Sequence, residues 1–359
     1  MVITKLYLKN FRQFKNNFFD FQSNLNLVIG CNTIGKSTIL ESLFFLSHGE
    51  SFKTCKNVEM INFDSQFGQL SVYLQNKKEV SKIELTLTSG LFNGKKKASK
   101  LYKINNQPKR KKDFLRNLIS ISFRPEDLRL IEGSPSRRRE YFNLILKITD
   151  PQYESALLNY ENNLKKRNCL LFQIREKQMP LNLLKFYNQQ MLKSAKIIYQ
   201  ARDNFCQFLN QFSFPIKLKI NYLSSIFNQE RLDIYQNKEI LVSHTLIGPQ
   251  KDDFEILYQF QPNQQLSIAS FGSRAQQRLA TLFLKIGEFY FLKQIFNRNP
   301  LILLDDILSE LDIDSQRLLF PLLSLSQTII TSSNLETEQI LKENNFNFNL
   351  INLPNKNLS

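Results

Sequence analysis

Apolar residues alternate with polar ones at the start of the chain, which is the pattern of β-strands. Ile3, Leu6 and Leu8 belong to a first predicted strand, residues 18–21 to a second and residues 25–29 to a third. Between residues 39 and 46 the apolar positions change to helical spacing, and strand-like patterns return at 68–74 and 81–88. The pattern therefore predicts a short loop, residues 30–38, between a strand and a helix.

A different pattern occupies residues 153–212, where apolar residues step by three and four. The first stretch contains Leu157, Tyr160, Leu164, Arg167, Leu171 and Ile174, and the second contains Leu184, Tyr187, Met191, Ser194, Ile198, Ala201, Phe205, Phe208 and Phe212. Met179-Pro180 interrupts the pattern between them. Narrow seams on two helices joined by a proline-containing turn predict an antiparallel coiled-coil hairpin. About thirty residues per helix would give an arm of about 40 Å.

The last part of the chain returns to mixed strands and helices. Strand-like segments are predicted at 216–222 and 239–246, and a long helix from residues 270–278 to about Phe296. Residues 301–306 form an apolar strand ending in two carboxylates, and residues 328–334 form another buried-strand candidate. The parts of one α/β unit thus lie near both ends of the chain, with the helical hairpin inserted between them.

Charge suggests a polyanionic partner. The chain has 359 residues, enough for two domains, and its formal charge of +16 favours nucleic acid or an anionic membrane. The abundance of Lys, Asn, Ile and Phe offers a competing explanation, because an AT-rich genome would enrich the same residues. The densest basic stretch runs from Lys95 to Lys112, where the interpretations of a solvated hairpin face and a DNA-backbone contact both stay open.

Cysteine and histidine usage disfavours several classes of site. Cys31, Cys55, Cys169 and Cys206 are scattered without a Cys-x-x-Cys pair, as expected for reduced thiols. Only two histidines are present, which disfavours a zinc site or a histidine-based triad. The amino terminus lacks a signal-peptide core and no run reaches the length of a membrane span, so we expect a cytoplasmic protein without a membrane partner.

The loop between the third strand and the first helix has the spacing of a phosphate-binding loop. It consists of Gly30, Cys31, Asn32, Thr33, Ile34, Gly35, Lys36, Ser37 and Thr38. Two glycines let the backbone N–H groups curl around phosphate oxygens, and the amino end of the helix faces the same anion. Lys36 can reach the β- and γ-phosphates and Ser37 can ligate Mg²⁺. The loop therefore predicts binding of ATP with Mg²⁺.

The apolar strand before Asp305 supplies a second half of such a site. A carboxylate at the carboxyl end of a buried parallel strand would face the Mg²⁺ held by Ser37. Asp306, the next residue, is placed to orient or deprotonate an attacking water. The two motifs together predict a P-loop nucleoside-triphosphate site.

The remaining motifs carry a family resemblance. Residues 273–278 resemble the signature of ABC-class ATPases, and residues 309–312 resemble their D-loop. The match narrows to the RecF family of SMC-like recombination and replication-repair proteins. Its further landmarks are found in Asn10-Phe11-Arg12, Ser51-Phe52-Lys53, Phe123 to Leu128, Gly133 to Arg139 and Gly248 to Asp253. The resemblance spans essentially the whole chain in the right order.

The resemblance implies both an architecture and a mechanism. The expected fold is α/β, an ABC/SMC-type P-loop ATPase head in residues 1–122 and 246–359, with an inserted, mostly helical arm domain in residues 123–245. In such heads ATP is held between two subunits, so Ser273 would contact the γ-phosphate bound by the partner. Ser333 takes the place of the switch residue that senses the γ-phosphate. ATP would close a homodimer on DNA and hydrolysis would open it. RecR and RecO would be partners in loading recombinase at gapped DNA.

Departures from the family pattern leave alternatives open. Thr33 replaces a usual glycine although β-branched residues tolerate positive φ poorly, and Ala275 replaces the signature glycine. A rival signature register places Ser270 where we place Ser273. Arg137, Arg138 and Asp253 are interpreted as ion-pair residues rather than site residues. The main interpretation is a slow, DNA-stimulated ATPase. The alternatives are an ATP-binding DNA adaptor without significant hydrolysis and an ATPase subunit of a membrane transporter, which would not need a coiled-coil arm.

Overall fold

The computed structural model describes residues 2–54, 56–76, 79–92, 95–96, 98–261 and 264–354. Cys55 and Lys97 of the sequence analysis lie outside the described residues. The chain divides into two compact units, residues 1–128 with 288–359 and residues 129–287. The first unit is therefore built from both ends of the chain. Among the described residues, no helix is both long and apolar enough to cross a bilayer.

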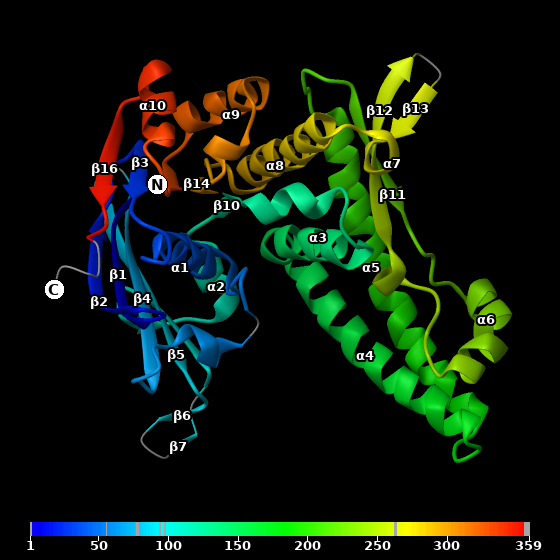
Figure 1. The fold of residues 1–359 in the computed structure, drawn as a ribbon. Helices are drawn as coiled ribbons and strands as arrows, with labels where there is room; N and C mark the ends of the chain where they lie inside the picture. Colours follow the sequence, from blue (N-terminus) through cyan, green and yellow to red (C-terminus); the bar gives the residue numbers. More distant parts are fainter. Residues whose placement is uncertain are drawn as a thin grey trace. The chain divides into compact units, whose positions relative to one another are not determined.

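The first unit contains an antiparallel sheet of six strands in the order β2-β1-β4-β5-β8-β9. Of these strands, β1, β2, β4 and β5 are labelled in Figure 1. Its strands are β1 (Val2–Phe11), β2 (Phe14–Asp20), β4 (Phe67–Asn76), β5 (Glu79–Thr88), β8 (Lys100–Ile104) and β9 (Gln107–Pro108). Between β5 and β8 lies a small pair, β6 (Leu91–Phe92) and β7 (Lys95–Lys96), and η1 (Asn57–Met60) precedes β4. The strands predicted at the start of the chain and at 68–74 and 81–88 are confirmed.

A parallel sheet of five strands, in the order β10-β14-β15-β3-β16, forms the rest of this unit. Its strands are β10 (Ser120–Phe123), β14 (Leu301–Asp305), β15 (Thr328–Ser332), β3 (Leu25–Ile29) and β16 (Phe348–Asn352). Helices α1 (Lys36–His48), α2 (Lys111–Leu115), α9 (Ile313–Leu325) and α10 (Glu336–Glu343) belong with it, as do η2 (Pro125–Leu130) and η5 (Leu308–Glu310). Every strand pair is parallel, so all carboxyl ends meet at one edge. The apolar runs of β14 and β15 are buried, as expected for parallel strands covered on both faces.

The second unit is mainly helical and contains the predicted hairpin. Helices α4 (Pro151–Arg175) and α5 (Leu184–Gln211) pack along their lengths, with η3 (Leu181–Leu183) in the turn between them. Seam residues such as Tyr160, Leu171 and Phe205 are buried, which confirms the hairpin. The unit also holds α3 (Pro135–Thr149), α6 (Gln229–Val242), η4 (Pro249–Lys251), α7 (Ile268–Phe271) and a sheet of β11 (Leu218–Leu223), β12 (Asp253–Gln261) and β13 (Gln264–Ser267). The long helix α8 (Arg274–Phe296) begins in this unit.

Two expectations differ from the structure. The strand predicted at 239–246 is wrong, because α6 continues to Val242. The run Ile240-Leu241-Val242 looks strand-like, but Leu241 and Val242 are exposed while Glu239 is buried against Arg167. The structural division falls after residues 128 and 287 rather than after 122 and 245, so residues 246–287 belong to the compact unit that contains the hairpin.

Candidate functional site

The loop between β3 and α1 curls as a phosphate-binding loop requires. Gly35 has φ 114° at the N-cap of α1, and a Cβ there would lie 2.6 Å from the Phe14 ring. A side chain at this position would therefore be excluded both by conformation and by space. Thr33 has φ 71°, which is the left-handed conformation. A β-branched residue rarely adopts this conformation, yet the loop requires it at this position. Thr33 thus has the positive φ that a β-branched residue tolerates poorly.

The Lys36 side chain lies inside the loop. Its ammonium donates to the carbonyl oxygens of Gly30, at 2.7 Å, and Cys31, at 3.1 Å, and the side chain is almost fully buried. These bonds hold the cation at the amino end of α1, where backbone N–H groups and the helix dipole also favour an anion. The positive charge is therefore concentrated where the sequence predicted phosphates.

The two halves of the predicted site meet at Ser37. Its hydroxyl donates to Asp305 Oδ1 at 2.8 Å, across 268 positions of sequence. Thr331, in the neighbouring strand β15, donates to the same oxygen at 2.8 Å. A serine hydroxyl and a carboxylate oxygen are hard oxygen ligands that fit Mg²⁺, which is usually held by few protein groups together with phosphates and water. Among the described residues, no cluster of three or more His, Cys, Asp or Glu side chains provides another metal site.

Asp306 and Ser333 are also brought together. Asp306 has φ 54°, and its backbone N–H donates to the Thr331 carbonyl at 3.1 Å. Its carboxylate accepts from the Ser333 backbone N–H at 3.1 Å and from the Ser333 hydroxyl at 3.3 Å. The left-handed turn thus directs the second carboxylate away from Asp305 toward the end of β15. Both residues lie at the carboxyl edge of the sheet, the edge at which the loop and Asp305 also lie.

A cavity of about 510 Å³ adjoins the phosphate-binding loop. Its lining includes Gln13, Phe14 and Ile34, together with residues of β2 and β16. Gln13 Oε1 accepts from the Thr38 hydroxyl at 3.3 Å, so this amide also buttresses the start of α1. Aromatic rings and side-chain amides beside a phosphate loop can hold the base and ribose of a nucleotide.

The segments around Arg12 and Ser51 converge on one buried carboxylate. Arg12 donates to Glu41 with Nε at 3.2 Å and with the NH2 group at 2.6 Å, and the Ser51 hydroxyl donates to Glu41 at 2.5 Å. Arg12 also donates to the Glu59 carbonyl at 2.7 Å. Because Glu41 lies on α1, this network fixes the helix that carries Lys36. These two sequence landmarks therefore position the site.

Ser273 forms a helix cap in the second unit. Its hydroxyl accepts from the Gln276 N–H at 3.3 Å, while the Gln276 side chain accepts from the Ser273 N–H at 2.8 Å. This reciprocal capping box places an exposed hydroxyl at the amino end of α8. Ser270 lies instead within the short helix α7. The capping geometry favours the register that begins at Ser273.

The glycine-containing motifs at 133–139 and 248–253 meet within the second unit. Arg138 forms a bidentate ion pair with Asp253, with Nε at 2.5 Å from Oδ1 and the NH2 group at 2.9 Å from Oδ2. Arg202 donates to Asp252 at 2.6 Å, and both side chains of that pair are buried. These motifs build the unit itself, in agreement with the interpretation of Arg138 and Asp253 as ion-pair residues.

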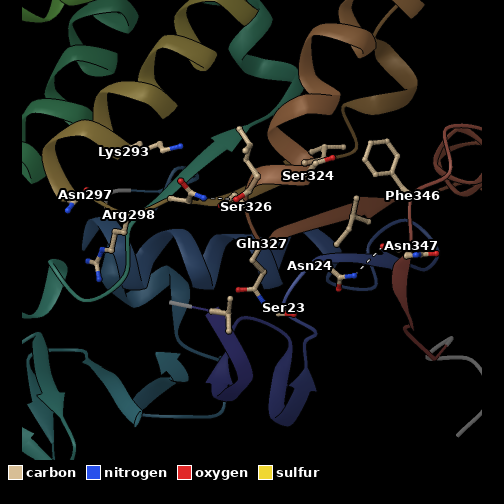
Figure 2. Close-up of a pocket in the computed structure, with 15 residues that line it drawn as sticks. Ser23, Asn24, Lys293, Asn297, Arg298, Ser324, Ser326, Gln327, Phe346 and Asn347 are labelled. Atoms are coloured by element: carbon tan, nitrogen blue, oxygen red, sulfur yellow. Dashed lines mark hydrogen bonds between the residues drawn. The ribbon is translucent and has the colours of Figure 1, made fainter. Parts of the chain in front are cut away.

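A second cavity, of about 640 Å³, lies at the opposite edge of the parallel sheet (Figure 2). It is lined at the amino ends of β3 and β15 by Leu25 and Gln327 and on α8 by Lys293. The Gln327 amide is used internally, donating to the carbonyls of Ile3 and Gln22 at 2.7 Å each. This cavity is remote from the phosphate-binding loop and is not part of the candidate site.

Sequence reasoning missed Gln13 and Thr331. Gln13 directly follows the Asn10-Phe11-Arg12 landmark, and only the fold reveals its contact with the loop. Thr331 is a polar residue at the carboxyl end of a buried strand, the same signal that identified Asp305. That signal marks Thr331 as a candidate, although its contact with Asp305 depends on the order of strands in the sheet.

Comparisons with known proteins agree with this geometry. A family model described as RecF/RecN/SMC N terminal domain matches residues 2–348. The DNA replication and repair protein RecF of Acetivibrio thermocellus is 31% identical over 373 residues, covering 98% of this chain and 97% of the relative. The protein of that name from Clostridium acetobutylicum is 31% identical, with 97% of each chain covered.

Solved structures give the same picture. A structure of the recombination mediator protein RecF-ATPrS in the RecFOR pathway superposes with a TM-score of 0.80 at 28% identity, covering 92% of each chain. An SMC head bound to the C-winged helix domain of ScpA has a TM-score of 0.50 at 17% identity, covering 93% of this chain and 90% of that one, a likeness of fold alone.

Proposed function

The chain belongs to the RecF/RecN/SMC N-terminal-domain family, and from this premise we propose that it is an ATP-dependent DNA-binding protein of replication and repair. Its fold is that of RecF and SMC heads, an α/β unit with a parallel sheet. The observation that carries the proposal is the hydrogen bond between Ser37 and Asp305 at 2.8 Å, which joins a phosphate-binding loop to a strand-end carboxylate. The likeness to RecF structures that contain ATP or ATPrS supports ATP as the nucleotide.

Each residue of the loop has a separate task in binding ATP. The Lys36 ammonium would exchange the carbonyls of Gly30 and Cys31 for phosphate oxygens, and the N–H groups at the start of α1 would donate to the same phosphates. Bound Mg²⁺ would neutralise phosphate charge, and Ser37 and Asp305 are the side chains that would hold it. The cavity beside Phe14 has room for the base and ribose.

For hydrolysis we assign Asp306 the role of orienting or deprotonating water. Ser333 holds the Asp306 carboxylate through two hydrogen bonds, so displacement of Ser333 by a γ-phosphate would free that carboxylate. The test is phosphate release with DNA present, comparing the wild type with Asp306→Asn. A slow wild-type rate that falls at least about a hundredfold in the variant supports catalysis by Asp306.

The alternative is an adaptor that binds ATP and DNA without significant hydrolysis. Thr33, with its left-handed backbone, and Ala275 motivate this alternative. Each carries a side chain where glycine would let the backbone approach a phosphate closely. Equal phosphate release by the wild type and Asp306→Asn, at the level of the buffer, would favour the adaptor.

ATP is proposed to close a homodimer. The exposed Ser273 hydroxyl at the amino end of α8 is suited to donate to a γ-phosphate held by Lys36 of the partner subunit. Two copies that each carry a formal charge of +16 repel one another, so bridging anions would favour the closed state. Ser273→Arg should abolish ATP-dependent dimerisation while leaving ATP binding to the monomer intact.

DNA and recombination mediators are the proposed partners. The related RecF structures are described within the RecFOR pathway, which supports RecR and RecO as partners of this chain at gapped DNA. The basic charge supports binding of the DNA backbone. DNA retention by the ATP-bound dimer, and its release when ATP is hydrolysed, would link the two activities.

A further inference from the structure

The most basic stretch of the chain lies between β7 and β10. From residue 95 to residue 116 it contains ten cations and one acid, Asp113. The cations are Lys95, Lys96, Lys97, Lys100, Lys103, Lys109, Arg110, Lys111, Lys112 and Arg116. Such an excess can serve the protein's own structure or an external anion, and the contacts of the individual side chains distinguish the two uses.

Two of these side chains lie at the carboxyl end of α1. Lys100 donates to the Gly49 carbonyl at 2.7 Å, and its ammonium lies 4.9 Å from the centroid of the Phe45 ring. The Lys111 side chain lies against Gly49, where an added Cβ would be 3.1 Å from its Cε. Cations at a helix carboxyl end interact favourably with the dipole and the last carbonyls. Lys100 and Lys111 therefore have an internal role.

Four other cations have no such role. Lys109, Arg110, Lys112 and Arg116 are exposed, and within the described part of the chain no ion pair or side-chain hydrogen bond engages their charged groups. The neighbouring acid Asp113 is exposed as well and pairs with none of them. On α2 the side chains of Phe114 and Leu115 are buried, so the helix is anchored while its cations face solvent. We call these four residues the α2 cation cluster.

The cluster is too far from the candidate nucleotide site to serve it. Helix α1 runs from Lys36 at the phosphate-binding loop to His48, and Gly49 at its other end contacts Lys111 of α2 (Figure 1). A helix of this length spans about 20 Å. A triphosphate bound at Lys36 would not reach α2. The α2 cation cluster therefore matches a second, extended anion.

We propose that the α2 cation cluster contacts the phosphate backbone of DNA, an inference that rests on the proposed DNA-binding function and assigns it a surface. Exposed cations that contact backbone phosphates fix the position of a protein on a duplex and contribute sequence-independent affinity. The surface lacks the apolar side chains that a membrane-binding face would need, since between residues 98 and 116 only Leu101 is a large apolar side chain with appreciable exposure. The chemistry therefore fits DNA backbone better than a lipid surface.

The test is the salt dependence of binding to a fluorescent duplex in the presence of ATP. The cluster variant carries Lys109→Gln, Arg110→Gln, Lys112→Gln and Arg116→Gln. The matched control removes four exposed lysines of α4 and α5, with Lys165→Gln, Lys166→Gln, Lys185→Gln and Lys193→Gln. Both variants lower the net charge equally, so only the position of the lost charge differs. Unchanged thermal unfolding would show that both variants fold.

The expected result is specific to the cluster. Loss of two to four phosphate contacts should reduce the slope of log K against log salt by about 2–4 and weaken binding at least about tenfold at low salt. The control should keep the wild-type slope. ATP-dependent dimerisation should be unaffected in both variants.

Each other outcome contradicts the inference in a distinguishable way. If the wild type does not bind DNA, the proposed function itself fails. If the wild type binds and the cluster variant keeps its slope, or both variants lose affinity equally, the phosphate contacts lie elsewhere. If the cluster variant loses binding to vesicles of anionic phospholipid but keeps DNA affinity, the surface is a membrane contact.

Discussion

Replacing Asp252 with alanine should destabilise the second unit strongly. Asp252 accepts from Arg202 at 2.6 Å, from the Ser225 N–H at 2.8 Å and from the Tyr222 hydroxyl. Burial alone lowers the pKa of Arg202, but Tyr153 and Asp252 beside it raise that pKa overall, so the guanidinium stays charged. The variant would leave this charge, only 1% exposed, without its carboxylate.

Removal of one partner from a buried ion pair costs about 3–5 kcal/mol. At about 2–4 °C per kcal/mol for a unit of this size, the second unit should unfold about 6–20 °C lower. Asp253→Ala is the matched control, because its ion pair with Arg138 is partly exposed, at 24% for Asp253 and 12% for Arg138, so water can solvate the guanidinium that remains; the variant should cost at most about 2 kcal/mol.

Urea unfolding followed by circular dichroism measures both variants. ATP binding should persist in both below the unfolding transition, because the phosphate-binding loop belongs to the other unit. If Asp252→Ala lowers the free energy of unfolding by less than about 1 kcal/mol, the buried ion pair does not hold this unit together and the reasoning is refuted.

Three further predictions concern the nucleotide site. ATP should protect the exposed Cys31 from N-ethylmaleimide while the exposed Cys169, on α4, reacts as before; equal labelling of Cys31 with and without ATP in peptide mass maps would contradict its place in the loop. Gly35→Ala should weaken binding of a fluorescent ATP analogue at least about tenfold, because the added Cβ collides with Phe14 at positive φ; unchanged affinity would mean that the loop rearranges. Chelation of Mg²⁺ should weaken ATP binding at least about tenfold in the wild type and much less in Ser37→Ala, measured by calorimetry; equal losses would remove the hydroxyl as a metal ligand.

The phosphate-binding loop could be predicted because its information is local. A buried strand, a loop with glycines at fixed spacing and a helix follow one another in sequence, and each has its own periodicity. Asp305 could be predicted because buried parallel strands expose their carboxyl ends at one edge. The unfavourable conformation at Thr33 could be expected only through the family resemblance, because the family usually has glycine at this position.

Features that depend on distant partners could not be predicted in the same way. The parallel sheet places β15 between β14 and β3, and this order brings Thr331 to Asp305. Glu239 lies in helix α6, where its carboxylate forms a buried ion pair with Arg167 of α4. Local β-propensity cannot reveal a pairing with a residue so distant in sequence. Lys100 and Lys111 look identical to Lys109 and Lys112 in sequence, and only contacts with Gly49 separate their roles.

Sedimentation velocity with ATP, with ADP and without nucleotide tests the central claim most directly. The account predicts that ATP alone converts the monomer to a dimer, and that Lys36→Ala stays monomeric under all three conditions. A wild-type protein whose sedimentation ignores nucleotide, or a Lys36→Ala variant that dimerises with ATP as the wild type does, would contradict it.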